Sequence, residues 1–256
     1  MRAALIVNRV VADRDANLTE ILDAVHSAAR AGAELVVLPE AATTGLAING
    51  DPLHDLALGQ PIPGPLTDEL AETAQRFQLH LAVGILERAG DALYDSAVLL
   101  CPGGDVVLHY RRIQLQWHAS GVDPAVYRQG DTVPAADTPL GRLSMILCGD
   151  LFDDDVIGQV REMRPDWLLF PFARCFDDGS YDRARWQGRE LPLYLERIRK
   201  VGCGTLMVNY LSAKDEDGYF GGAAVVSARG EVIAHLPIGH AGTLLVDVAE
   251  LATPSQ

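Results

Sequence analysis

The sequence predicts an α/β fold formed as one domain of residues 1–256. The chain has 256 residues, of which 48% are hydrophobic, and this is enough to bury one large core. In the first half, short apolar runs alternate with stretches of helical periodicity, the pattern of strands packed against helices. Paired strands predominate in the flanking parts of the chain. Because no internal repeat, linker or low-complexity segment interrupts the chain, nothing indicates a second domain.

The first half begins with a strand, a helix and a second strand. Ala3–Val7 is a short apolar run, and a helix with a regular apolar face follows from Asn17. Gly32 closes that helix, as glycine often does just past a helix end. Leu35–Leu38 is typical of a second buried strand, and Thr67 is the predicted N-cap of a second helix.

The remaining elements follow from the same patterns. Strands are predicted at Leu79–Leu86, Tyr94–Cys101, Val106–Ile113, Trp167–Phe172, Thr205–Asn209 and Thr243–Val248. A helix is predicted at Leu191–Val201 and a hairpin at Ala223–His235. Gln116–Ala136 is irregular, and its mixture of aromatic and polar residues suits the rim of a pocket.

Cys148 stands at the end of the apolar run Leu143–Asp150, whose sequence is LSMILCGD. A buried strand, a tight turn at Gly149 and a helix over Leu151–Met163 are predicted here, and such an elbow aims a nucleophile at a helix N-terminus. The alternative is a buried cysteine that acts as a small hydrophobic residue. Asp153, Asp154 and Asp155 favour that alternative, because nearby negative charge disfavours a thiolate.

Other candidate residues also follow strands. Glu40 comes directly after Leu35–Leu38, and a carboxylate there must be paired, exposed or functional; the alternative is that it caps the following loop. Tyr110 and Arg112 share one face of their strand by alternation, although a lone arginine is usually an exposed surface group. Arg174 follows the strand that ends in Phe172.

Composition excludes several classes of partner. The net charge of −14 would repel nucleic acid and anionic membranes. The segment Met1–Val11 is too short for a secretory signal, and no run approaches the length needed to cross a bilayer. The four cysteines have neither metal-ligand spacing nor paired spacing, so we expect no metal, no other cofactor, no disulfide framework, and a cytoplasmic location.

Several segments together resemble the nitrilase or carbon–nitrogen hydrolase superfamily, in its amidase-like branch. The resemblance runs from Met1 to about Val248, and its motifs occur in the family's order and spacing. They are GAELVVLPE, YDSAVLL, VVLHYRRIQL, TPLGRLSMILCGD, VNY and FGGAAVVSARGEVIA. It implies a four-layer α-β-β-α sandwich and a homodimer or larger homo-oligomer.

The resemblance also implies a Glu-Lys-Cys site with a second glutamate nearby. Glu40 matches the general base and Cys148 the nucleophile. The lysine position holds Arg112, and the second glutamate position holds Asp123, so these two roles are filled by different residue types. The guanidinium of arginine is larger than an ammonium, and the shorter aspartate compensates in this interpretation. Further departures are Asp95 where asparagine is common and Gly149 where an aromatic residue often follows the nucleophile.

Two functional hypotheses follow. The first is a hydrolase that cleaves a small amide or N-carbamoyl compound through a cysteine acyl-enzyme, with a nitrile as the less favoured substrate class. In that case Gly149, Tyr110, Arg174 and Phe172 would contact the substrate. The second is a catalytically weakened relative that binds a ligand or a partner. The presence of both Glu40 and Cys148 favours the hydrolase.

Overall fold

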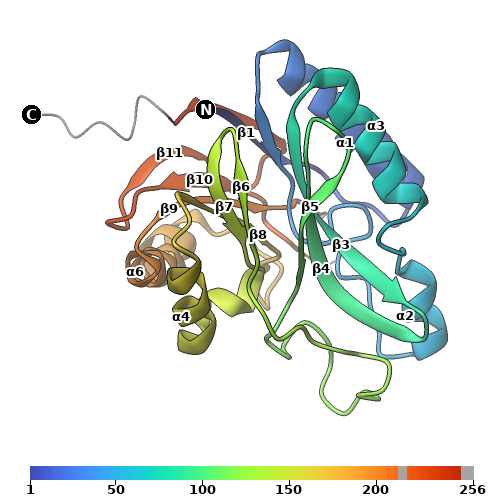
Figure 1. Cartoon of the computed structure of the whole chain (residues 1–256). Coiled ribbons are helices and arrows are strands. Elements are labelled where there is room, and N and C mark those ends of the chain that lie inside the picture. The colour runs from blue at the N-terminus through green and yellow to red at the C-terminus, as the bar shows by residue number, and fades with distance from the viewer. Residues whose placement is uncertain (213–217, 249–256) are drawn as a thin grey trace, which may run out of the picture.

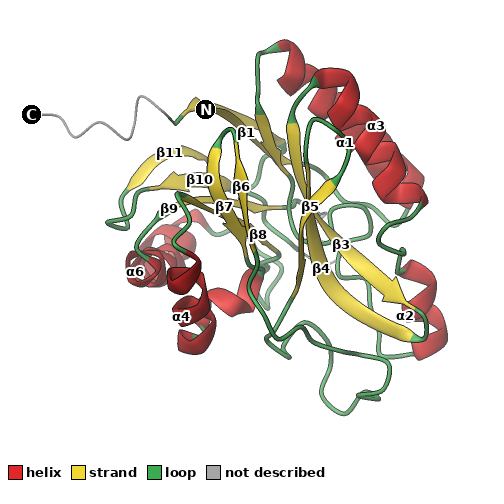
Figure 2. Ribbon diagram, in the orientation of Figure 1, coloured by secondary structure: helices red, strands yellow, loops and turns green. Residues whose placement is uncertain are grey.

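Two six-stranded sheets pack face to face, and helices cover the outer face of each sheet in the computed structural model (Figure 1 and Figure 2). The structure describes residues 1–212 and 218–248. In strand order, the first sheet consists of β12 (Gly242–Asp247), β1 (Arg2–Val7), β2 (Leu35–Val37), β3 (His80–Ala89), β4 (Ala92–Leu100) and β5 (Val106–Arg111). The second consists of β11 (Val232–Leu236), β10 (Ala223–Val226), β9 (Gly204–Asn209), β8 (Trp167–Phe172), β7 (Gly141–Met145) and β6 (Ala135–Thr138).

The helices form the two outer layers. They are α1 (Arg14–Arg30), α2 (Pro52–Leu58), α3 (Pro65–Phe77), α4 (Asp154–Met163), the short α5 (Arg183–Arg185) and α6 (Leu191–Val201). Two further helical segments are not α-helices. They are the more tightly wound 3₁₀ turn η1 (Cys148–Phe152) and the more widely wound π-helical turn η2 (Trp186–Glu190). Because α1 and α3 lie on one side and α4 and α6 on the other, the predicted four-layer α-β-β-α sandwich is confirmed (Figure 1).

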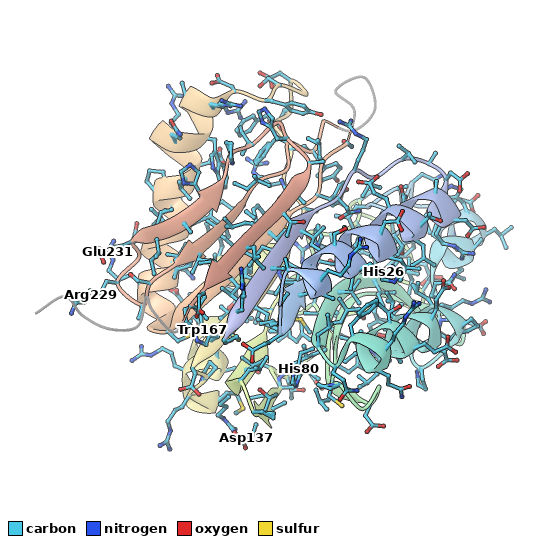
Figure 3. The ribbon with its side chains drawn as sticks, turned by 90° about the horizontal axis from the view of Figure 1, so that it is seen from above. His26, His80, Asp137, Trp167, Arg229 and Glu231 are labelled. Carbon is cyan, nitrogen blue, oxygen red and sulfur yellow. The ribbon has the colours of Figure 1, made fainter. Side chains whose placement is uncertain are left out.

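Strand β1 shows why the apolar runs are continuous. Leu5 faces the other sheet and joins the core between the two sheets. Ile6 points the opposite way and packs with Ile21 of α1 in the core under the helices. A strand that is buried on both faces needs an apolar residue at every position. Charged residues stand where the chain is exposed to water, as Arg229 and Glu231 do at the tip of the β10–β11 hairpin (Figure 3).

The sequence misplaced two helix starts. Helix α1 begins at Arg14, because the Asp13 side chain accepts hydrogen bonds from the first turn. Asn17 is buried instead, and its amide donates to the carbonyl oxygen of Thr43. Helix α3 is capped at Gly64, whose N–H donates to the Thr67 hydroxyl one turn inside the helix. Both errors arise because a polar side chain inside the first turn resembles a cap.

The other predicted element bounds agree with the structure in some places and differ from it in others. The bounds of β8 and α6 are those predicted. The apolar run at Leu143–Asp150 leaves the strand after Met145, and α4 begins at Asp154, after the 3₁₀ turn η1. Strand β6 begins within the segment predicted to be irregular, and α2 was not predicted. Within residues 1–212 and 218–248, no helix combines the length and the apolar composition needed to cross a membrane.

Candidate active site

Chain segments from both sheets meet where several strands end. Glu40 follows β2, Arg112 follows β5, and Cys148 follows β7. Asp95 lies within β4, where its backbone carbonyl accepts a hydrogen bond from the N–H of Arg112 at 2.8 Å. The pairing of β4 with β5 therefore sets Asp95 beside Arg112, and the packing of the two sheets brings Cys148 to them.

Cys148 occupies a strained elbow. Its φ of 40° lies in the left-handed region, which costs a residue other than glycine about 1–3 kcal/mol. The half-buried Cys148 borders a cavity of about 270 Å³, and its thiol donates to the Ala173 carbonyl oxygen at 3.4 Å. The elbow predicted at Cys148 is therefore present. Helix α4, which was expected to follow the elbow directly, begins at Asp154, and the 3₁₀ turn η1 separates it from the end of β7.

Glu40 is held by a close backbone contact with β3. Its side chain has no exposed surface. Gly84 donates from its N–H to the Pro39 carbonyl oxygen and accepts from the Ala42 N–H, each at 3.0 Å. A Cβ on Gly84 would lie only 2.4 Å from the Glu40 Cα, so only glycine permits this approach. Burial, followed by the charges of Asp95 and Cys148, raises the pKa of Glu40 despite the opposing charge of Arg112.

Arg112 joins two buried carboxyl groups. Its Nη1 donates to Glu40 Oε1 at 2.9 Å and to Asp95 Oδ2 at 3.2 Å, and only 3% of its side chain is exposed. Gly130 supports the Arg112 backbone by donating to its carbonyl oxygen at 2.9 Å. Burial alone would lower the pKa of Arg112, but the surrounding negative charges outweigh burial and raise it, so the guanidinium stays charged.

A third buried carboxyl group lies beside this cluster. Asp150 accepts from the Tyr110 hydroxyl at 2.6 Å and from the Gln114 N–H at 2.7 Å. Burial raises the pKa of Asp150 to about 6, although these hydrogen bonds and Arg112 oppose the shift. Tyr110 was predicted to contact the substrate, but it is fully buried and does not border the cavity. Its hydroxyl orients Asp150 instead.

The other predicted substrate contacts do not gather around one cavity. Arg174 borders the Cys148 cavity, but its guanidinium is bound to Glu190 through Nη2 at 2.9 Å. Phe172 faces a different cavity of about 220 Å³ and stacks on Phe170 with ring centroids 5.4 Å apart. Gly149 lies against Arg112, because a Cβ there would be 2.6 Å from Nη2.

Asp123 is not brought into the cluster. Its side chain is exposed, and its Oδ1 accepts from the Ala125 N–H at 2.8 Å within its own loop. Asp95 supplies the second carboxyl group beside Arg112 instead. The signal for Asp95 was available in the sequence, since an acidic residue inside an apolar strand must be paired if it is buried. In the sequence, Asp95 stands out only as a departure from the family pattern.

The fold and this arrangement define an α-β-β-α sandwich with a cysteine, a buried glutamate and a cation at one end of its sheets. The family model described as carbon-nitrogen hydrolase matches residues 2–254, and the chain belongs to this family.

Relatives with known names match over different lengths. The human omega-amidase NIT2 is 25% identical over 242 residues, which cover 91% of this chain and 83% of that protein. Nitrilase 2 of Arabidopsis thaliana is 28% identical over 166 residues, or 58% of this chain. The chain spans about half the length of the Arabidopsis nitrilases that it matches, 48% for nitrilase 2 and 43% for nitrilase 3.

Solved structures share the fold. A carbon-nitrogen hydrolase from Helicobacter pylori G27 superposes with a TM-score of 0.84 at 20% identity, covering 98% of this chain and 90% of that one. A mutant of the amidase from Nesterenkonia sp. AN1 gives a TM-score of 0.77 at 21% identity, covering 96% and 92%.

Proposed function

We propose that the protein hydrolyses a small, uncharged carboxamide or N-carbamoyl compound through an acyl-thioester on Cys148. One observation carries the proposal: the strained Cys148 elbow and Arg112 border the same cavity, and Arg112 is bound directly to the buried Glu40. An inert binding scaffold does not require a nucleophile, a base and a cation in this arrangement.

The residues act in two stages. Glu40 takes the thiol proton as Cys148 Sγ attacks the carbonyl carbon, and the carbonyl oxygen becomes an oxyanion. Arg112 and the backbone N–H of Gly149 stabilise that oxyanion. Glu40 then returns the proton to the leaving nitrogen. Water attacks the thioester while Glu40 takes one of its protons, and the acid departs as the thiol re-forms.

The cavity favours a small and uncharged substrate. Its volume of about 270 Å³ lies just below the usual range for ligand pockets, which begins at about 300 Å³. Both arginines that border it are already paired, Arg112 with Glu40 and Arg174 with Glu190. A carboxylate on the substrate would have to compete with these protein carboxylates. Arg174, which the sequence predicts to contact the substrate, is therefore paired with Glu190 and not available to a substrate carboxylate.

The relatives support amide chemistry over nitrile chemistry. Omega-amidase NIT2 aligns over most of this chain, and formamidases of Bacillus species are 32% identical over 145 residues. The Nesterenkonia amidase carries the product of acrylamide addition on its active site cysteine, and in this proposal Cys148 has the equivalent role. We further propose one domain that works in the cytoplasm as a homodimer or larger homo-oligomer.

The test maps which cysteine reacts with iodoacetamide. Cys148 should be labelled well ahead of Cys101, Cys175 and Cys203. Cys203 is an internal control, because burial raises the pKa of its thiol to about 12. Glu40→Gln should slow Cys148 labelling by about 10²-fold or more, the size typical of a lost general base.

Glu34→Gln is the matched control, because Glu34 is an exposed carboxylate outside the cavity and should leave the rate as it is. If Cys148 reacts no faster than the other cysteines and Glu40→Gln has no effect, the hydrolase proposal fails. The chain would then be a binding module, and turnover of simple amides should be absent as well.

A further inference from the structure

The carboxyl groups around Arg112 outnumber the cations. Glu40, Asp95 and Asp150 each have no exposed surface. Among the residues that the structure describes, Arg112 is the only buried lysine or arginine. If all three carboxyl groups were ionised, the cluster would hold two uncompensated negative charges away from water. Because burying unpaired charge is costly, such a group binds a proton instead.

Hydrogen bonding shows where that proton is needed. Asp150 is suited to the ionised form, because both of its oxygens accept bonds, one from Tyr110 and one from Gln114. Glu40 and Asp95 have no such support. Each uses one oxygen to accept from Arg112 Nη1, whereas the buried Glu40 Oε2 and Asp95 Oδ1 have no partner among the described residues. One proton can satisfy both of these unpartnered oxygens, because it forms the O–H of one carboxyl group and donates a hydrogen bond to the other.

We propose that Glu40 and Asp95 form a carboxyl pair that shares one proton between Glu40 Oε2 and Asp95 Oδ1 at neutral pH. The pair then carries one negative charge beside the positive charge of Arg112, so the cluster keeps one uncompensated negative charge, that of Asp150, in place of two. Asp95 is a positioning residue in this arrangement, because it acts through Glu40 and touches neither the cavity nor the substrate. The raised pKa of Glu40, to which burial and Asp95 both contribute, agrees with a pair that retains a proton.

The catalytic consequence, though not the proton itself, rests on the hydrolase activity proposed above. When Cys148 loses its proton to Glu40, the pair becomes neutral and holds two protons, one on each carboxyl group. The thiolate then replaces the pair as the counterion of Arg112. The net charge of the buried cluster stays the same before and after the transfer, so no isolated charge is created in the site. Without the shared proton, the initial state would carry an extra negative charge beside the thiol.

Other titratable groups surround the pair from each neighbouring element. Those whose charges act on Glu40, or on the groups in contact with it, are Arg112, Cys148, Asp150, Tyr194 and Tyr210. Burial raises the pKa of Tyr194 and of Tyr210, so both stay neutral at physiological pH and neither adds a negative charge to the cluster. Among the residues that the structure describes, Asp150 is therefore the other buried carboxyl group of the cluster that could hold the proton, and the test must distinguish it from the pair.

The experiment is infrared difference spectroscopy of the full chain at about pH 8, two units above the pKa near 6 of Asp150. The wild-type protein should show the C=O stretching band of a protonated carboxyl group. Asp95→Asn should abolish this band, because the asparagine amide donates to Glu40 without needing the proton. Glu40→Gln should abolish it for the corresponding reason.

Two control variants should keep the band. Asp150→Asn removes the competing carboxyl group, and Cys148→Ala removes the thiol, yet neither touches the shared proton. Circular dichroism checks that every variant is folded, and a variant that fails this check is replaced by uniform ¹³C-aspartate or ¹³C-glutamate labelling of the wild type, which should displace the band. The proposal is overturned if the wild type lacks the band, or if Asp150→Asn removes it. Because none of these readouts uses turnover, they stand even if the protein proves not to be a hydrolase.

Discussion

Arg112 Nη2 occupies the space that a side chain on Gly149 would need, since a Cβ at position 149 would lie 2.6 Å from it. In the family that this chain resembles, a lysine usually stands at position 112 and an aromatic residue often follows the nucleophile. An ammonium group has no second branch, whereas the guanidinium is forked and fills more space beside the elbow. Arginine at 112 and glycine at 149 are therefore structurally dependent on each other.

Gly149→Ala tests this dependence. The added methyl group should displace the Arg112 guanidinium and slow iodoacetamide labelling of Cys148 by about 10- to 100-fold, because small displacements in a reactive site have effects of this size. Gly158→Ala is the matched control, because nothing lies within 4 Å of a Cβ there and alanine favours helix α4. Adding Arg112→Lys to Gly149→Ala should restore part of the lost rate. An unchanged labelling rate in Gly149→Ala would show that Arg112 does not need this space.

Gly84→Ala should damage both stability and the site. A methyl group there would meet the Glu40 Cα at 2.4 Å and the Pro39 carbonyl oxygen at 2.6 Å, and backbone atoms cannot move aside as a flexible side chain can. The free energy of unfolding in urea should fall by about 1–3 kcal/mol or more. Gly188→Ala, which meets nothing within 4 Å, should leave stability nearly unchanged. Equal stabilities for the two variants would contradict the close approach of β3 to Glu40.

Glu87 should give the protein a stability that depends on acid pH. Burial opposes ionisation, but hydrogen bonds from His109, Arg111 and Ser96 outweigh it and lower the pKa of Glu87 from about 4.5 to about 2. A depressed pKa means that the stabilisation is present above about pH 4.5 and is lost as the pH falls through about 2. At 1.36 kcal/mol per unit, Glu87→Gln should cost about 3 kcal/mol at pH 7.

The control for Glu87→Gln is Asp137→Asn. Asp137 pairs with Arg142 at 2.8 Å, but 81% of its side chain is exposed at the edge of the molecule (Figure 3). An exposed ion pair contributes under about 1 kcal/mol, so this variant should unfold almost as the wild type does. Urea unfolding across the pH range measures both effects. A constant deficit for Glu87→Gln at every pH would rule out the proposed linkage.

Glu190→Gln should change the charge preference of the cavity. With Glu190 neutral, Arg174 becomes available to a carboxylate on the substrate. The KM for an amide that also carries a carboxylate should fall by roughly tenfold, as expected for one charge-assisted hydrogen bond. The KM for an uncharged amide should not change. Arg174→Met in the same background should cancel the gain. A parallel change in both KM values would indicate a general disturbance of the cavity.

The sequence by itself determined the architecture and two members of the site. Short apolar runs such as those of β1 and β8 predicted buried strands, and the family resemblance implied that these strands form a four-layer sandwich. Glu40 and Cys148 became candidates because each follows a predicted buried strand, and the family resemblance matched them to the general base and the nucleophile. These signals lie within a few residues of chain, and no long-range contact was needed to find them.

Only the tertiary structure decided what surrounds those two residues. Asp123 matched a family spacing yet lies exposed in its own loop, whereas Asp95 meets Arg112 because β4 pairs with β5 and the side chain has no access to water. Tyr110 and Phe172 were placed near the site by strand position, but the packing of the sheets turned one toward Asp150 and the other toward a separate cavity. Contacts between distant segments depend on register and layer packing, which the local pattern of one sequence does not encode.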